Sequence, residues 1–400
     1  MDERNKVRLL INGQDFYEHW SSVSIISELN ALARAFQVSV TAKLPNSLPT
    51  VKQFNLGDHV QVFIGTDLVL SGYLEQLPIS YNAHNVTATL AGRSKTCDLV
   101  DCSVMVAGRQ ITAQNANSWA KATAPIAGRL VQAPQVSATS WRQQSVENII
   151  AQLIAPYNVK LIIEDGDFSQ KINHDVEPTE TVHEALKHLV LKDEDLLFYD
   201  NENGDLVIAK RGSSQCIDAL VVGSNVLSGK ADFNGTQRFN EWRVIGQSSG
   251  NDSSFGKTVC GYEGTYQDPE IKRTRYKCEQ FSGQATNAAC EKQAKNKIRY
   301  SASQYLKTSY TVAGWRQSDG SLWKINTKVK ISDPFLDIDA DGFLISKVVY
   351  SLDNTNGLTT TLEVMPEYGI YNEPQTDKAK KSKSKSDLSW INKPEPKAKA

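Results

Sequence analysis

The sequence predicts an α+β, mainly β protein. Between Val312 and Met365, apolar and polar residues alternate with a period of two, the pattern of strands that bury one face and expose the other. Between Ser145 and Ala155, apolar residues instead recur at helical spacing and form one stripe. Strand patterns therefore dominate both ends of the chain, and helical patterns appear between them.

The first piece, residues 1–95, is predicted to be strands joined by tight turns. Gly65-Thr66, Pro78 and His84-Asn85 interrupt its apolar and alternating runs, and these residue types favour turns. The expected strands are Val7–Ile11, Val38–Lys43, Val60–Ile64, Leu68–Leu77 and Val86–Ala91. Short strands at this spacing predict a small antiparallel β-barrel.

The second piece, residues 96–212, is predicted to be an α+β domain. Helices are expected at Ser145–Ala155 and around Glu180–Leu191. Strands are expected at Lys160–Glu164, Leu196–Asp200 and Leu206–Lys210.

The third piece, residues 213–370, returns to strand patterns and predicts a second antiparallel β-barrel. A strand with one buried and one wet face is expected from the alternation of Ile325, Thr327, Val329 and Ile331 with Lys324, Asn326, Lys328 and Lys330. A second strand is expected from Phe343 to Leu352. Asn356-Gly357, residue types that tolerate positive φ, then form a hairpin turn, and Thr359–Val364 is the returning strand.

One segment interrupts this third piece. Ala285–Ser301 is polar, rich in Ala and Lys, and free of Pro and Gly, which predicts a solvated helix. The second barrel is therefore expected to be discontinuous, with a helical insert at about residues 282–303.

The last piece, residues 371–400, is rich in Lys, Ser and Pro and is predicted to be a flexible tail. Such a composition buries too little apolar surface to offset the entropy of ordering. Its single apolar spot, Trp390-Ile391, is a candidate for docking on a neighbour.

Charge and apolar runs exclude several classes of protein. The 44 Lys and Arg nearly balance the 45 Asp and Glu, so no global field recruits nucleic acid or an anionic membrane. Residues 377–400 alone hold eight Lys against Asp377, Asp387 and Glu395, a net of +5. No apolar run approaches the roughly 20 residues of a membrane span, and no signal peptide is recognisable at Met1, so we expect synthesis in the cytoplasm and no membrane anchor. Because the cytoplasm is reducing, we expect the six cysteines to be free thiols.

Three near-motifs for enzymes fail on geometry. His183 and His188 resemble a zinc-binding HExxH pair, but they are five positions apart and cannot share a helix face. Gly246–Gly250 fits G-x-S-x-G, yet a polar turn follows where a nucleophile elbow needs a helix. Gly250–Thr258 has one residue too many for a phosphate-binding loop and leads into a predicted strand.

The segment Asp337–Gly342 reproduces the first half of a calcium-binding loop through Asp337, Asp339 and Asp341. The position that needs a bidentate Glu is Val348, so we reject an EF-hand-like site and expect a turn that exposes three carboxylates. A weak cation site is the alternative.

Two further charged groups have simple structural interpretations. Carboxylate pairs for glycoside hydrolysis need not be close in sequence, but Asp193-Glu194-Asp195 is more simply a solvated cap and turn. Arg273 and Arg275 alternate with Thr274 and Tyr276, which puts two cations on one strand face, lining either a pore or a solvated edge. We assign no catalytic, cofactor or metal residues.

Three groups of motifs resemble one family in order and spacing. The first is Gly57-Asp58-His59-Val60, Leu70-Ser71-Gly72-Tyr73, Gly92-Arg93-Ser94 and Leu99-Val100-Asp101; the second is Glu180–Leu186 followed by Leu197–Asp200 and Gly204–Val207. The third is Gly314-Trp315, Gly320–Trp323, Asn326, Asp333-Pro334, Leu344–Ser346 and Gly357–Thr360. Over roughly residues 5–370 the chain resembles the Mu-like phage baseplate hub family (late control D-like), which is related in fold to the T4-like central hub and to type VI secretion spike proteins.

The resemblance implies a non-enzymatic protein of the virion tail, assembled in the host cytoplasm. Its implied role is a homotrimeric ring that joins the tail tube and other baseplate proteins to the membrane-piercing spike. Two similar barrels per subunit would adapt a threefold spike to a sixfold tube. No specific recognition of nucleic acid is expected, and whether DNA passes through the channel is left open by the sequence. The alternatives are a tail-associated cell-wall hydrolase and a carbohydrate- or cation-binding module.

Overall fold

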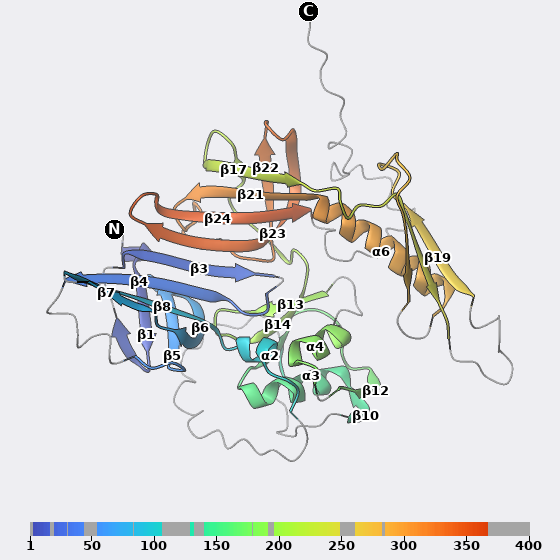
Figure 1. The fold of residues 1–400 in the computed structure, drawn as a ribbon, viewed down its shortest axis with the longest axis horizontal. Coiled ribbons are helices and arrows are strands. Elements are labelled where there is room, and N and C mark those ends of the chain that lie inside the picture. The colour runs from blue at the N-terminus through green and yellow to red at the C-terminus, as the bar shows by residue number, and fades with distance from the viewer. Residues whose placement is uncertain are drawn as a thin grey trace, which may run out of the picture. The chain divides into compact units, whose positions relative to one another are not determined.

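The chain forms two compact units (Figure 1). The computed structural model describes residues 3–16, 20–29, 31–43, 54–82, 84–105, 129–131, 140–177, 179–190, 196–248, 261–281 and 285–366. Unit 1 comprises Met1–Ser213, Val312–Asn326 and Ser346–Leu362, and unit 2 comprises Ser214–Thr311, Thr327–Ile345 and Glu363–Ala400. The predicted division into four pieces, with boundaries at 95, 212 and 370, stays a prediction.

Unit 1 contains an antiparallel sheet built from both ends of the chain. Its order is β23-β3-β4-β8-β6-β5-β1-β2, and the short β7 pairs with β8. The 3-10 helix Glu3–Asn5 precedes this sheet. The strands are β1 (Val7–Ile11), β2 (Gln14–Phe16), β3 (Ser22–Glu28), β4 (Ala35–Lys43), β5 (His59–Ile64), β6 (Asp67–Gln76), β7 (Ile79–Tyr81), β8 (Asn85–Ser94) and β23 (Ile338–Asp353).

The predicted N-terminal barrel is wrong, because this sheet stays open. At one edge, β2 pairs only with β1 among the described strands. At the other, β3 pairs with Lys347–Leu352 of β23. A strand from the far end of the chain thus occupies the edge that closure into a barrel would need.

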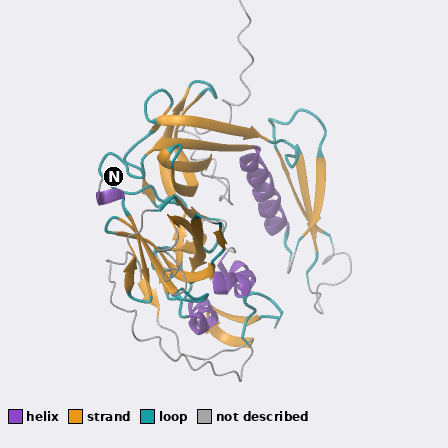
Figure 2. Ribbon diagram, turned by 60° about the vertical axis from the view of Figure 1, so that its left-hand side comes forward, coloured by secondary structure: helices purple, strands orange, loops and turns teal. Residues whose placement is uncertain are grey.

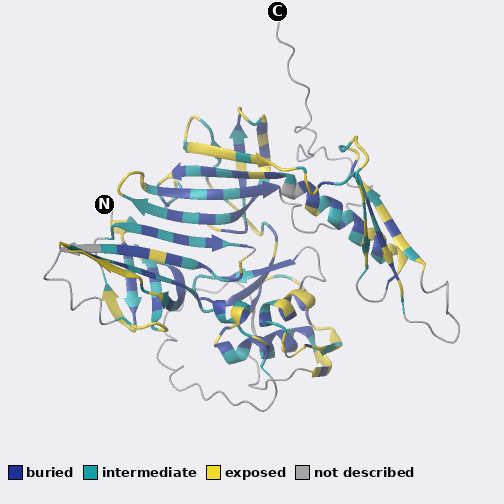
Figure 3. Cartoon of the chain, in the orientation of Figure 1, coloured by how far each residue is buried: buried dark blue, intermediate teal, exposed yellow. Residues whose placement is uncertain are grey.

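Alternating burial confirms the predicted strand character. Burial alternates residue by residue along β1, β5 and β8, which were predicted, and along β3, which was not. Figure 3 shows the same banding along β3 and β4. Side chains of successive residues point to opposite faces of a sheet, so the apolar set of each strand reaches the core together.

A layer of helices and short strands follows in unit 1. Its elements are α2 (Cys97–Asp101), β9 (Arg129–Val131), β10 (Ser140–Ser145), α3 (Val146–Ile154), a 3-10 turn (Ala155–Tyr157), β11 (Leu161–Ile163), β12 (Lys171–Asp175), α4 (Val182–Val190), β13 (Leu196–Asp200) and β14 (Leu206–Lys210). The helices and strands predicted here are confirmed, and α3 and α4 bury their apolar stripes in one core. The sheet β13-β14-β11-β9 completes this layer.

Unit 2 holds a small sheet covered by one long helix. Its β18 (Glu241–Gly246) lies between β19 (Tyr262–Gln267) and β20 (Tyr276–Gln280). Helix α6 (Asn287–Tyr305) confirms the predicted helix, but the expectation of a solvated one is wrong: Cys290, Ala294 and Ile298 form a buried stripe at four-residue spacing. A Cβ at Gly264 would lie 2.0 Å from the Glu291 nitrogen, so only glycine admits the helix this close to β19.

The remaining strands of unit 2 also form no barrel. They are β15 (Ser214–Gln215), β16 (Leu220–Val221), β17 (Val226–Phe233) and β22 (Thr327–Asp333). Strand β22 pairs with β15, β16 and β23, whereas β17 lies at a sheet edge beside β21 (Leu306–Ala313). Figure 2 shows strands as the main element of the described chain, and none of its sheets closes on itself. The mainly β class is therefore confirmed and the second barrel is wrong.

The predicted hairpin near the C-terminus is confirmed. Strand β23 ends at Asp353 and β24 (Gly357–Pro366) begins at Gly357, which has a φ of +70°. The Asp353 carboxylate accepts hydrogen bonds from the Thr355 and Asn356 nitrogens and orders the turn. Strands β21, β23 and β24 contribute residues to both units.

Several predicted features lie outside the described residues. These are Asp193–Asp195, the last two residues of Gly246–Gly250, all of Gly250–Thr258, and the tail 371–400. In the part that is described, no helix has the length and apolar composition to cross a bilayer.

Candidate functional site

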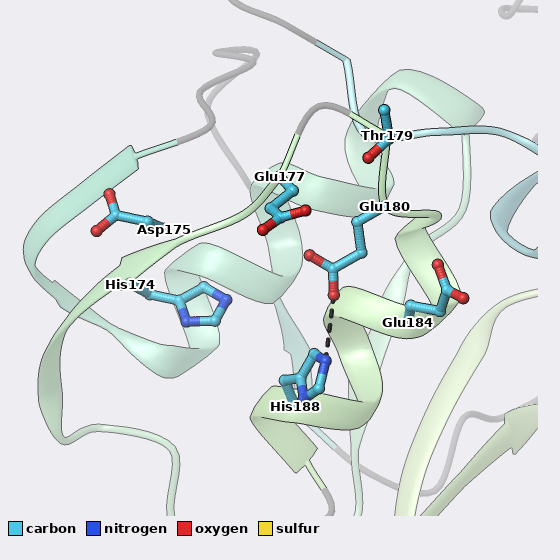
Figure 4. A pocket seen from close by; sticks show the side chains of 7 residues that line it. All are labelled: His174, Asp175, Glu177, Thr179, Glu180, Glu184 and His188. Atoms are coloured by element: carbon cyan, nitrogen blue, oxygen red, sulfur yellow. Dashed lines mark ion pairs between the residues drawn. The ribbon is translucent and has the colours of Figure 1, made fainter. Parts of the chain in front are cut away.

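The structure forms an acidic pocket beside α4 in unit 1 (Figure 4). This pocket has a volume of about 490 Å³. It is lined by His174, Asp175, Glu177, Thr179, Glu180, Glu184 and His188. Its four carboxyl groups and two imidazoles are groups that can carry out acid–base chemistry or bind a metal ion.

Two of these carboxylates already accept hydrogen bonds from neighbouring residues of the chain. Thr181 donates from its nitrogen and its Oγ1 to Glu184 Oε2, at 2.9 and 3.2 Å, and accepts from the Glu184 nitrogen, which is a capping box at the start of α4. These bonds lower the pKa of Glu184. Arg142 Nη1 and Ser140 Oγ donate to Asp175, at 2.7 and 2.6 Å, and lower the pKa of that carboxyl.

This arrangement does not suit glycoside hydrolysis. That reaction needs one carboxyl group with a raised pKa as the acid, beside a second that stays ionised. The pKa shifts of Asp175 and Glu184 both go downward. Burial raises the pKa of the Asp98, Glu164 and Asp200 carboxyls, but none of the three lines the pocket.

The two histidines of the HExxH-like segment have separate environments. His183 packs edge-on against Phe198 of β13, with ring centroids 5.6 Å apart, and burial lowers its pKa. His188 is exposed and its Nε2 lies 3.3 Å from Glu180 Oε1. Among the described residues, no three His, Cys, Asp or Glu side chains are placed to hold a metal ion.

The calcium-loop-like segment is a strand, so the expected turn is wrong. The turn comes earlier, at residues 334–337, and β23 begins at Ile338. Ile338 and Ala340 are buried, whereas Asp339 and Asp341 are exposed, because an extended backbone sends alternate side chains to opposite faces. A β-bulge opposite Lys330 follows, with Gly342 at a φ of +86°.

The expected pair of cations on one strand face is also wrong. Strand β20 begins only at Tyr276, after Arg273 and Arg275. The Arg275 guanidinium donates to the carbonyl oxygens of Gly235 and Thr236, at 3.0 and 2.7 Å. Arg275 therefore joins two loops of unit 2.

The tightest polar constellation is a buried junction within unit 1. Arg34, just before β4, is 7% exposed, and Asp200, the last residue of β13, is fully buried. Arg34 Nε lies 3.3 Å from Asp200 Oδ1, its Nη2 donates to the Asp200 carbonyl at 3.0 Å, and its Nη1 donates to the Val69 carbonyl at 3.1 Å. One guanidinium thus joins the N-terminal sheet to the β13–β14 hairpin.

A third segment of unit 1 reaches the same junction. Glu202 lies 3.6 Å from Arg34 Nη1 and 3.2 Å from Lys324 Nζ. Burial alone would raise the pKa of Glu202, but the charges of Arg34 and Lys324 lower it to about 2. Asn326, expected on a wet face, is buried with a φ of +59° and bonds Lys210 and Gly212 through its amide.

Arg316 makes a second junction of the same kind. Its guanidinium donates to Asp67 at 2.7 Å, to the Arg4 carbonyl at 2.7 Å and to the Ile64 carbonyl at 3.1 Å. Nearby, the fully buried Trp315 donates from Nε1 to the carbonyls of Ser351 and Thr359. The segment 312–326 is thereby fixed to the N-terminal strands.

Sequence reasoning missed both junctions. Arg34 and Asp200 lie 166 positions apart, and Arg316 and Arg4 lie 312 apart, so no local spacing connects them. What these residues can do chemically is hold segments together: Arg34 and Asp200 are paired in the interior, and Arg316 pairs with the half-exposed Asp67 nearer the surface.

Family models agree with this structural character. Residues 6–94 match the model for the Mu phage baseplate assembly protein GpP-like, N-terminal; residues 127–210 match the second domain of baseplate hub protein gp44-like; and residues 286–373 match the fourth domain of Mu phage baseplate assembly protein GpP. In three separate segments the chain is thus similar to Mu-like baseplate hub proteins, and by this similarity it is a component of the phage virion tail.

Known relatives extend the match over nearly the whole chain. Baseplate hub protein gp44 of Escherichia phage Mu is 26% identical over 381 residues, which is 94% of this chain and 91% of gp44. The 43 kDa tail protein of prophage MuSo2 from Shewanella oneidensis is 25% identical, with a TM-score of 0.74 over 91% of this chain and 99% of that one. The first is named a baseplate hub protein and the second a tail protein.

Two further solved structures share the fold. The tail protein from Neisseria meningitidis MC58 is 22% identical, with a TM-score of 0.70 over 92% of this chain and 97% of that one. A chain of the Francisella PdpA-VgrG complex is 8% identical, with a TM-score of 0.51 over 92% of this chain and 59% of its own length. The resemblance in the sequence motifs is thus confirmed.

Proposed function

We propose that this chain is the structural hub of a contractile-tail baseplate, a homotrimeric ring that joins the tail tube to the membrane-piercing spike. The observation that carries the proposal is the match to gp44 of phage Mu over 94% of the chain, with three baseplate domain models matched along it. The Arg34 and Arg316 junctions of unit 1 support a mechanical role, because they hold together segments that are distant in the chain.

Exposed strand edges support self-assembly. In the described chain β2 ends the sheet of unit 1, and β17 of unit 2 pairs on one side only, with β21. Leu227 and Phe233 of β17 are 62% and 46% exposed. Unpaired edges bind strands of other chains. An edge of unit 2 in one subunit would pair with unit 1 of the next.

Such a head-to-tail contact is heterologous, and it closes into a ring only where the rotation divides a full turn. Permanent contacts of this kind usually bury more than about 2,000 Å². Three subunits with two β-rich units each would present six surfaces to the tube and three to the spike. The channel lining would be polar, so that DNA passes without being gripped.

Electron microscopy of the purified protein tests this proposal. Threefold rings with a central hole are the expected result. Compact single subunits at every concentration would overturn the hub role and favour the alternative of a tail-associated hydrolase.

We infer that the chain has no hydrolase activity of its own. The carboxylates Asp175 and Glu184 of the acidic pocket have lowered pKa values and are engaged by neighbouring side chains. Purified peptidoglycan should stay turbid when the protein is added. Clearing that disappears in the variant Glu180→Gln would contradict this inference, and the variant Lys171→Gln, outside the pocket, is its control.

A further inference from the structure

Positive charge is concentrated in one part of unit 2. Residues 271–307, which include β20 and α6, hold nine Lys and Arg against Glu279 and Glu291, a net of +7, while the whole chain has a net charge of −1. A local excess of this size attracts acidic partners and aligns them before contact.

A second pocket opens within this basic region. It has a volume of about 430 Å³, and its walls come from β17, β18, β20, α6 and the start of β21. Its lining includes Trp242, Lys277, Glu279, Lys297 and Lys307, together with Asp232.

Two of the three lysines are already paired in the pocket. Lys277 Nζ lies 3.3 Å from Glu279 Oε1, and Lys297 Nζ lies 3.0 Å from Glu279 Oε2. Both ammonium groups also lie over the Trp242 ring, at 4.8 and 5.9 Å from its centroid. Although burial opposes it, the hydrogen bonds and charges of these lysines lower the pKa of Glu279.

The third ammonium group has no such partner. Within the described chain, no carboxylate lies within salt-bridge distance of Lys307, although Asp232 shares the lining. Trp242 is 5% exposed, and its Nε1 has no acceptor in the same set of residues. The pocket thus has three ammonium groups against two carboxylates. The indole N–H of Trp242 in its wall donates no hydrogen bond within the described chain.

We propose that this pocket receives an aspartate or glutamate side chain from an acidic segment of a partner protein. The incoming carboxylate would pair with Lys307, and a charge-assisted hydrogen bond at such a site is stronger than a neutral one. The inference rests on the hub role, because it assigns one surface of the hub to contact with another protein.

The same geometry disfavours nucleic acid. Binding of single strands relies on exposed aromatic faces on which bases stack. The Trp242 ring is buried beneath two lysines, so it offers no exposed face on which a base could stack.

A fluorescein-labelled oligoglutamate peptide tests the proposal by anisotropy, with the full-length protein at low ionic strength. The variants Lys307→Gln and Lys297→Gln should each weaken peptide binding roughly fivefold, the upper range for a partly exposed ion pair. Lys295→Gln is the matched control, because it removes the same charge from α6 but lies over Tyr266, outside the lining.

Each possible result decides the proposal. Selective loss in the two pocket variants, with no competition from inorganic phosphate, supports it. Absence of binding, equal loss in all three variants, or tighter lysine-dependent binding of an oligothymidylate overturns it. The anisotropy assay measures peptide binding to the pocket, whereas the proposed ring is tested by the molar mass of the protein. Either proposal can therefore be wrong without the other.

Discussion

Replacing Arg34 by methionine should destabilise unit 1 strongly. Methionine fills part of the guanidinium's space but leaves the fully buried Asp200 carboxylate without its counter-charge, and it leaves the carbonyls of Val69 and Asp200 without donors. Removing one partner of a buried ion pair costs about 3–5 kcal/mol. Because domains are stable by only about 5–15 kcal/mol, this loss is a large fraction of the total.

Urea unfolding of the full-length protein, followed by circular dichroism, measures the effect as a shift of the transition midpoint. The control is Arg142→Met, which breaks an ion pair with Asp175 that is shorter, at 2.7 Å, but exposed. We expect no measurable shift in the control, because water screens such pairs. If Arg34→Met lowers the free energy of unfolding by less than about 1 kcal/mol, the ion pair contributes no more than a surface pair does. That result would refute the argument that burial makes this ion pair important for stability.

The remaining predictions concern pH, the tail and calcium. Because Glu202 has a folded pKa of about 2 against an ordinary value of 4.5, it contributes stability above pH 4.5 that is lost as the pH falls toward 2. The free energies of unfolding from urea titrations at neutral and acid pH should therefore differ less in Glu202→Gln than in the wild type, by up to about 3 kcal/mol. An unchanged pH dependence would count against the junction. Deletion of residues 372–400 should leave the thermal midpoint nearly unchanged, whereas failure to fold would place the tail in the core. Calorimetry should detect no calcium binding tighter than about millimolar, and micromolar binding abolished by Asp339→Ala would revive the cation site.

Local patterns predicted individual elements well. Val7–Ile11, Leu196–Asp200 and Leu206–Lys210 are strands with the predicted ends, because apolar runs and flanking turn residues set these boundaries within a few positions. The stripe of Ser145–Ala155 likewise predicted α3, since the spacing of a buried helix face is local information.

Whether a sheet closes into a barrel was not predictable from such patterns. A strand's alternation shows which face is buried but not which strand lies beside it, and β3 pairs with residues more than three hundred positions later. The solvated-helix prediction for α6 was wrong for a related reason. Cysteine and alanine in its narrow stripe are weakly apolar, so the pattern indicated no buried face.

The candidate sites show the same limit. Helix geometry correctly separated His183 from His188, because five residues of helix fix the angle between them. The turn predicted at Asp337–Gly342 failed because Ile338 and Ala340 already alternate with the aspartates, a strand signal inside an apparent loop motif. Arg34 and Asp200 form their pair only after the chain has folded.

Static light scattering at micromolar and nanomolar concentration tests the central claim most directly. The hub proposal rests on permanent head-to-tail contacts, which should survive dilution. It predicts a molar mass of three subunits at both concentrations. A mass of one subunit at both would contradict the ring.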